Sequence, residues 1–143
     1  RRVDDNVTAK LRFKGGAKGT IWASQVAVGH ENGLSLRVYG DKGGLTWGQE
    51  DPNVMTFTPF GQPAQILTRG GASPIGSQSS GLRTPPGHPE GWLEGFATIY
   101  KDAATLIRGG DAALPTVRDG LSGMRFIESC IESNSKNGEW VQY

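Results

Sequence analysis

Two histidines are the side chains of this 143-residue chain best suited to proton transfer near neutral pH. His88 lies in Thr84-Pro85-Pro86-Gly87-His88-Pro89-Glu90-Gly91-Trp92, directly before a predicted helix. Backbone N–H groups at a helix start can hold an anion or a polar ligand, so His88 could contact a substrate or relay a proton there. A structural role, in which His88 caps the helix or packs against Trp92, explains the same residue.

His30 lies in a polar turn, Gly29-His30-Glu31-Asn32-Gly33, where a solvated side chain is the simpler interpretation. His30 and His88 could meet in space, but no third ligand accompanies them at metal-binding spacing. The sequence therefore predicts no metal site.

Three further polar side chains have both a functional and a structural interpretation. Gln25 and Arg83 could donate hydrogen bonds into a cleft, and both also suit an ordinary surface. Glu90 could act as a general acid or base, but a carboxylate in the first turn of a helix also complements the helix dipole.

Short segments of alternating apolar and polar residues, joined by tight turns, fill the chain before residue 69. They predict strands near residues 7–13, 19–28, 34–39, 45–47, 54–58 and 64–68. The expected fold class is α+β, with an open, mainly antiparallel sheet of about six or more strands followed by two helices on one face or edge.

A glycine-, serine- and proline-rich segment, residues 69–87, separates the strands from the helices. Segments this long without regular structure are often lids or linkers, and the sequence leaves a lid and a flexible connector as open alternatives. Pro89 and Glu90 suit the first turn of the next helix, and Gly109-Gly110 ends it. Its apolar stripe comprises Leu93, Phe96, Ala97, Tyr100, Ala104 and Ile107.

A second helix follows Pro115, with Thr116 as its N-cap and Asp119 completing a capping box. Asn137-Gly138 ends this helix, and Trp140-Val141 predicts a short final strand. Helical spacing predicts a buried face of Val117, Leu121, Met124, Ile127 and Ile131.

Composition narrows the possible partners. The net charge is +1 and the basic residues are scattered, so neither nucleic acid nor an anionic membrane is an expected partner. No apolar stretch approaches the ~20 residues of a membrane helix. The single cysteine excludes an internal disulfide and fits a reducing, cytoplasmic compartment. The chain also has no Gly-x-Gly-x-x-Gly dinucleotide-binding fingerprint after a strand.

Several stretches, taken together and in this order, resemble the Gfo/Idh/MocA oxidoreductases. They are Asp5-Asn6-Val7-Thr8-Ala9-Lys10-Leu11-Arg12-Phe13, Gly16-Ala17-Lys18-Gly19-Thr20-Ile21, Val38-Tyr39-Gly40-Asp41-Lys42-Gly43-Gly44-Leu45, Gly87-His88-Pro89-Glu90-Gly91-Trp92, Pro115-Thr116-Val117-Arg118-Asp119-Gly120-Leu121 and Gly138-Glu139-Trp140-Val141. Each motif alone is weak, whereas their succession over nearly the whole chain is fairly specific.

The resemblance implies a missing half. The family pairs an N-terminal NAD(P)-binding Rossmann domain with a C-terminal α/β domain on an open antiparallel sheet, and this chain is similar to most of the second domain. The family's Glu-Lys-Pro motif with its catalytic lysine has no match here, and neither does the Asp and His pair that opens the second domain. Both would lie upstream of Arg1, and a first residue other than methionine fits either the interior of a longer polypeptide or a processed start.

The expected function is therefore that of a C-terminal substrate-binding and oligomerisation domain, residues 1–143, of an NAD(P)-dependent dehydrogenase. The implied reaction is hydride transfer on a sugar or polyol, and the chain alone should be inactive, with no catalytic, cofactor-binding or metal-binding residue of its own. NAD or NADP would bind to the parent protein. Expected partners are the chain's own Rossmann domain, a small sugar-like substrate and further copies through the outer sheet face.

By position in the family, the helix start at His88 should face the cleft between the domains. The resemblance makes His88 the first substrate-contact candidate, followed by His30, Gln25, Arg83 and Trp92. Trp92 could stack on a sugar ring or simply pack.

Two other functions remain open. The chain could be a non-enzymatic binding or self-association module that uses the open sheet face. It could also be a complete small enzyme that uses His30 and His88, although it has no convincing catalytic triad or metal set.

Overall fold

The computed structural model describes residues 3–71 and 82–143, which form two compact units. One unit joins Arg1–Gly29 to Pro115–Tyr143, and the other is His30–Leu114. Most of the predicted loop at residues 69–87 lies outside the described residues, so its flexibility stays a prediction.

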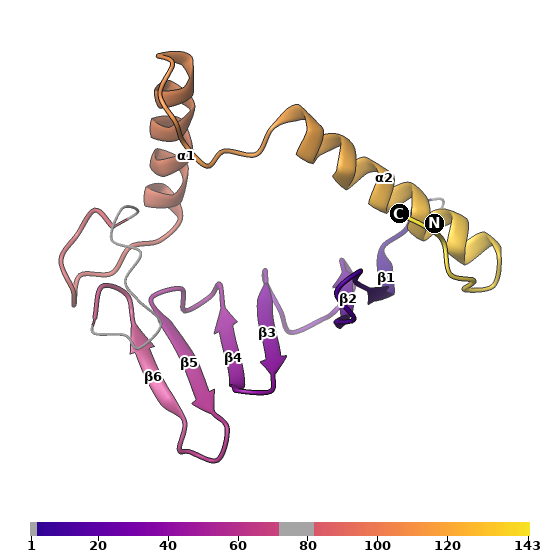
Figure 1. Ribbon diagram of the computed structural model, residues 1–143, viewed down its shortest axis with the longest axis horizontal. Helices are drawn as coiled ribbons and strands as arrows, with labels where there is room; N and C mark the ends of the chain where they lie inside the picture. The colour runs from indigo at the N-terminus through magenta and orange to yellow at the C-terminus, as the bar shows by residue number, and fades with distance from the viewer. Residues whose placement is uncertain (1–2, 72–81) are drawn as a thin grey trace. The chain divides into compact units, whose positions relative to one another are not determined.

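The unit His30–Leu114 is built on a four-stranded antiparallel sheet in the order β3-β4-β5-β6 (Figure 1). Its strands are β3 (Ser35–Gly40), β4 (Gly43–Gly48), β5 (Val54–Pro59) and β6 (Gln65–Thr68). Short turns join consecutive strands, which therefore pair with their sequence neighbours. Helix α1 (Trp92–Ile107) completes the unit.

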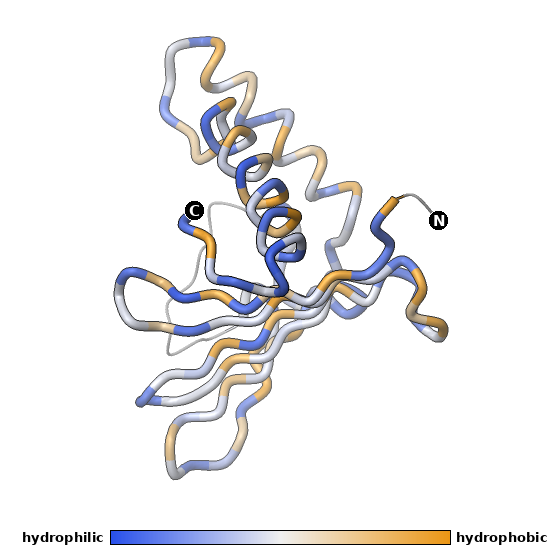
Figure 2. Tube along the Cα trace, turned by 90° about the vertical axis from the view of Figure 1, so that its right-hand side faces the viewer, coloured by the Kyte–Doolittle hydropathy of each residue, from blue (hydrophilic) through white to orange (hydrophobic). Residues whose placement is uncertain are grey.

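Strand register gives this sheet two different faces. Val38 pairs with Leu45, Leu45 with Phe57, and Met55 with Leu67, so one face is apolar. Leu67 is the best covered of these side chains at 8% exposure, which locates the core of this unit on the apolar face. Figure 2 shows the corresponding alternation of hydrophobic and hydrophilic residues along the tube.

The opposite face of the sheet is mostly polar and exposed. Arg37 pairs with Thr46, Thr46 with Thr56, and Thr56 with Ile66. Since the side-chain period of a strand is two, these residues share one face. This polar side is the open face of the sheet.

The other unit contains a β-hairpin, β1 (Asn6–Arg12) and β2 (Lys18–Ser24), and helix α2 (Val117–Ser135). The Phe13 N–H donates to the Ala17 carbonyl at 2.9 Å, which closes the hairpin. The Trp22 indole N–H donates to the Asn6 side-chain oxygen at 3.0 Å and joins the two strands.

Helix α2 begins and ends as its sequence predicts. The Thr116 N–H donates to the Asp119 carboxylate at 2.6 Å, and the Asp119 N–H donates to the Thr116 hydroxyl at 3.4 Å, which confirms the capping box. At the other end, Asn137 and Gly138 have φ values of 57° and 84°, a conformation that cannot continue a right-handed helix.

The predicted fold class is confirmed: six antiparallel strands in open sheets precede two helices. The strands form two sheets, because β2 and β3 do not pair with each other. Helix α1 begins at Trp92, which corrects the expected start at Pro89.

The final strand predicted at Trp140-Val141 is wrong, because these residues are irregular. Two aromatic side chains of this C-terminal segment, Trp140 and Tyr143, contact neighbouring elements. The Arg12 guanidinium lies 3.8 Å from the centroid of the Trp140 ring, and the Tyr143 hydroxyl donates to the Ser122 carbonyl at 2.9 Å.

The predicted buried face of α2 is also wrong as stated, since its apolar side chains are 51–91% exposed. Helical periodicity identifies which side of a helix is apolar, but it does not supply a surface to cover that side. The exposed residues are Val117, Leu121, Met124, Ile127 and Ile131.

We expect Gly43→Ala to destabilise the four-stranded sheet. Gly43 has φ 155°, and a Cβ there would lie 2.5 Å from the Thr58 carbonyl oxygen, so the backbone must shift. The free energy of unfolding should fall by about 1–3 kcal/mol, measured by urea denaturation followed by circular dichroism. Gly48→Ala in the same strand is the control, because its Cβ would meet nothing within 4 Å. Equal losses in the two variants would contradict this interpretation.

Candidate functional site

A polar cluster fixes the segment that leads into α1. We call Asn53, Arg69, Thr84 and Glu90 the Arg69 cluster. Arg69, directly after β6, donates from Nε to the Asn53 side-chain oxygen at 3.1 Å and from Nη2 to the Thr84 hydroxyl at 2.9 Å. It also forms an ion pair with Glu90, at 3.2 Å between Nη1 and Oε2. The Arg69 and Glu90 side chains are only 14% and 9% exposed.

Both carboxylate oxygens of Glu90 have partners. Oε2 faces Arg69, and Oε1 accepts from the backbone N–H groups of Arg83 and Thr84 at 2.6 and 2.7 Å. Burial by itself raises the pKa of this carboxyl, but the two N–H donors and the Arg69 charge outweigh it, so the pKa lies below its ordinary value. Glu90 is therefore an ionised acceptor at neutral pH, which does not suit a general acid.

The backbone of Glu90 is held as firmly as its side chain. Its N–H donates to the Asn53 side-chain oxygen at 2.9 Å, and its carbonyl accepts from the Asn53 amide nitrogen at 2.9 Å. Glu90 precedes α1 rather than lying in its first turn, so the expected interaction with the helix dipole is wrong for this residue.

Glu94 takes that position at the start of α1. The Gly91 N–H donates to its carboxylate at 2.9 Å, and this hydrogen bond is the main reason that the pKa of Glu94 is lowered. Asp119 has the same place in α2, where hydrogen bonds from Thr116 lower its pKa. Each described helix start already holds a carboxylate, so the anion considered for the helix start after His88 would meet a like charge there.

His88 lies in a turn four residues before α1, and its backbone belongs to the network. Its N–H donates to the Pro85 carbonyl at 3.2 Å. Its own carbonyl accepts from the Thr84 hydroxyl at 3.0 Å and from Arg69 Nη2. The residue itself is exposed. Main-chain contacts therefore fix its place and leave it accessible.

Arg83 and Trp92 lie on the same short segment as His88. Arg83 lines a hollow of about 420 Å³ together with Lys101, Asp102 and Asp111, so that charges of both signs surround the space. Trp92, the first residue of α1, is 76% exposed and meets Phe96 edge to face, with ring centroids 5.5 Å apart.

The other two candidates lie elsewhere. His30 is exposed in the loop before β3, where the Glu50 carboxylate accepts from the Asn32 and Gly33 N–H groups at 3.4 and 3.1 Å. Gln25 follows β2 in the other unit, and its N–H donates to the Asp5 carbonyl at 2.8 Å. The candidate site is therefore centred on residues 82–92.

Sequence reasoning missed Arg69 and Asn53. An arginine directly after a short strand and an asparagine in the Asp51-Pro52-Asn53 turn are ordinary surface residues by pattern. The signal was Glu90, the single acidic residue of the sequence between Arg69 and the helix, because such a carboxylate requires a cation or N–H donors when it is buried.

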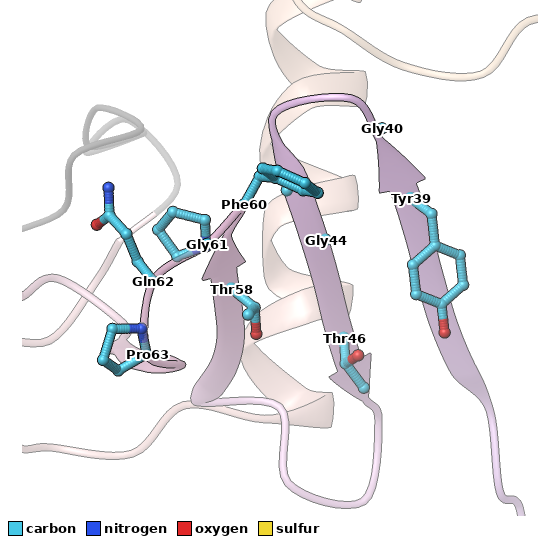
Figure 3. Close-up of a pocket in the computed structure, with 11 residues that line it drawn as sticks. Tyr39, Gly40, Gly44, Thr46, Thr58, Phe60, Gly61, Gln62 and Pro63 are labelled. Atoms are coloured by element: carbon cyan, nitrogen blue, oxygen red, sulfur yellow. The ribbon is translucent and has the colours of Figure 1, made fainter.

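A second hollow, of about 600 Å³, lies on the open face of the sheet. Figure 3 shows Tyr39, Thr46 and Thr58 projecting from the strands beside Phe60 and Gln62 of the β5–β6 turn. The lining mixes aromatic rings, hydroxyl groups and glycine backbone, which suits a flat contact surface better than a catalytic pocket.

Residues 3–71 and 82–143 contain neither a cluster of metal ligands nor a membrane-spanning helix. Within these ranges no three His, Cys, Asp or Glu side chains gather closely enough to hold a metal ion. Neither of the two described helices is long and apolar enough to cross a membrane.

A family model for the oxidoreductase C-terminal α/β domain, Gfo/Idh/MocA, matches residues 1–143. This chain belongs to the Gfo/Idh/MocA family. The resemblance seen in the sequence motifs is thereby confirmed.

Solved and curated relatives of this Gfo/Idh/MocA domain are longer proteins. An oxidoreductase from Sinorhizobium meliloti is 50% identical with a TM-score of 0.91, and the match covers 99% of this chain and 42% of that one. An inositol dehydrogenase homolog from Azotobacter vinelandii, solved with NADH and myo-inositol, is 32% identical with a TM-score of 0.83, covering 99% and 40%. Levoglucosan dehydrogenase from Pseudarthrobacter phenanthrenivorans is 26% identical, covering 97% and 36%.

We expect Glu90→Gln to lower the urea midpoint at pH 7, because the substitution removes the charge that faces Arg69. The folded-state pKa of Glu90 is depressed, so its stabilisation is present above the unfolded value of about 4.5 and is lost as the pH falls through the lower folded value. The difference between parent and variant should therefore shrink below about pH 4.5.

Glu132→Gln is the matched control, because it makes the same change in an exposed pair with Lys136, whose side chains are 48% and 51% exposed. Exposed pairs of this kind contribute little to stability. A Glu90→Gln difference that stays constant from pH 7 to pH 3 would contradict the assigned ion pair.

Proposed function

We propose that residues 1–143 act as one substrate-binding and oligomerisation domain of an NAD(P)-dependent dehydrogenase whose substrate is a sugar or polyol. The reaction is reversible hydride transfer between the nicotinamide and a hydroxyl-bearing carbon. The cofactor is held by an N-terminal Rossmann domain in the remainder of a longer, cytoplasmic protein. This domain shapes the substrate side of the cleft and contributes no catalytic residue.

The likeness to the Azotobacter vinelandii homolog carries the proposal, because that structure contains both a nicotinamide cofactor and a polyol. The chain spans only about two fifths of that protein. Its described helix starts are occupied by Glu94 and Asp119, which is consistent with cofactor binding outside this domain. Levoglucosan dehydrogenase, a relative named for a sugar substrate, supports the same substrate class.

His88 is the first residue that we assign to the substrate side. Its backbone is fixed and the residue is exposed, so the imidazole can offer one donor and one acceptor to neighbouring hydroxyl groups of a polyol. Arg83 and Trp92 lie on the same segment and form the next group of candidates, followed by His30 and Gln25. Exposed aromatic rings such as Trp92 suit stacking on the apolar face of a sugar ring.

The open face of the sheet favours a second role, association between copies. Tyr39 and Ile66 on this face are 76% and 75% exposed, and the hollow beside them is shallow and mixed in character. Self-association through this face is compatible with the dehydrogenase role. If the protein had no cofactor domain, self-association would itself be the function, and the chain would be a non-enzymatic module.

Titration calorimetry with NAD(H) and NADP(H) tests the dehydrogenase proposal. We expect no heat of binding to residues 1–143 alone and about one-to-one binding to the longer protein that carries this domain. Micromolar binding to the isolated chain would mean that the chain holds a nucleotide site of its own, and the proposed division of roles would then be wrong.

Thr46→Arg tests association through the open face. Thr46 lies on a central strand beside Arg37, so a second guanidinium would place like charges in the centre of the contact. We expect light scattering to show a lower oligomeric state for this variant. Asn134→Arg, on α2, is the control and should keep the parent's state. A parent that is monomeric at all concentrations would contradict this role.

A further inference from the structure

We propose that Arg69 is a positioning residue that sets the place of His88 for substrate contact, an inference that rests on the proposed function. No motif marks Arg69, and it follows a strand outside the segment that carries the candidate residues. Its guanidinium contacts Pro85 before His88 and Glu90 after it.

One guanidinium gathers main-chain groups from three positions of the loop. Besides the Thr84 hydroxyl, Arg69 donates to the carbonyl groups of Thr84 at 3.3 Å and Pro85 at 3.4 Å, and to that of His88. Arginine has five N–H donors in a planar fork, whereas lysine has a single ammonium group on a flexible stem. Only an arginine at this place can hold all three carbonyl groups and the Glu90 carboxylate together.

The loop is anchored on both sides of His88. Thr84 and Pro85 precede it and bind Arg69, while Glu90 follows it and binds both Arg69 and Asn53. Two anchors that flank the residue remove most of the backbone freedom of the segment between them. A side chain that orients the substrate needs close placement, since misplacing a bound substrate by about 1 Å can lower the rate about a hundredfold.

The cluster acts on the backbone of His88 and not on its imidazole. The carbonyl and the N–H of His88 are the groups that Arg69, Thr84 and Pro85 contact. A variant of Arg69 should therefore shift the place of the ring while it leaves the chemical nature of the ring unchanged. This separates positioning from a direct contact with substrate.

Arg69→Lys is the variant to test, because it keeps the positive charge near Glu90 and removes the planar set of five N–H donors. Two measurements on the 143-residue chain need no substrate. Hydrogen exchange of the Thr84 and Glu90 amides should accelerate about tenfold, while the amides of β3 to β5 keep their rates. The NMR resonances of the His88 ring should move and broaden. Arg37→Lys, on the open face, is the matched control and should change neither measurement.

Steady-state kinetics of the longer protein then test whether the placement of His88 matters for turnover, with myo-inositol as substrate and NAD as cofactor. We expect Arg69→Lys to lower kcat about 10- to 100-fold with a smaller change in KM. Unchanged amide exchange and unchanged His88 resonances in Arg69→Lys would overturn the positioning role. If those signals change while His88→Ala leaves turnover intact, the substrate role of His88 fails. If the parent does not turn over myo-inositol with NAD, the proposed use of a polyol such as myo-inositol is overturned. The positioning role of Arg69 is then decided by the exchange and NMR measurements alone.

Discussion

A charged pair that is largely closed off from water is stable only if nearly every donor and acceptor in it has a partner. Arg69 and Glu90 meet this condition by drawing on the loop around them. The remaining N–H groups of Arg69 go to main-chain carbonyl groups and to the side-chain oxygens of Asn53 and Thr84. The second oxygen of Glu90 accepts from two main-chain N–H groups. Residues 83–90 therefore follow a path in which their backbone groups supply hydrogen bonds to one ion pair.

This constraint links the sheet to the helix that follows it. Asn53 ends the β4–β5 turn, Arg69 directly follows β6, and Glu90 lies just before α1, so one cluster joins three separate parts of the unit. Glu94 then completes the transition by accepting from Gly91 at the helix start. The approach to α1 is built from two carboxylates, Glu90 and Glu94, that accept hydrogen bonds from the backbone, and His88 just before them remains exposed.

The sequence predicted those features of the fold that depend on residues close together in the chain. Alternation of apolar and polar residues found the six strands, and Thr116, Asp119 and Gly138 found the ends of α2, because pleat and capping depend on residues a few positions apart. The pairing of Arg69 with Glu90 joins residues far apart in sequence, which spacing rules cannot reach. The start of α1 was misplaced for a related reason: Glu90 fits a first turn, but its long-range partners hold it outside the helix.

Strand β6 has a consequence for how the sheet can grow. It has only four residues, Gln65–Thr68, at one edge, with Pro63 shortly before it and the charged Arg69 directly after it. Short edge strands bounded by proline and charge are poor templates for a strand from another molecule. Sideways extension into a continuous intermolecular sheet is thus discouraged at this edge, and flat stacking of copies remains the easier mode of contact.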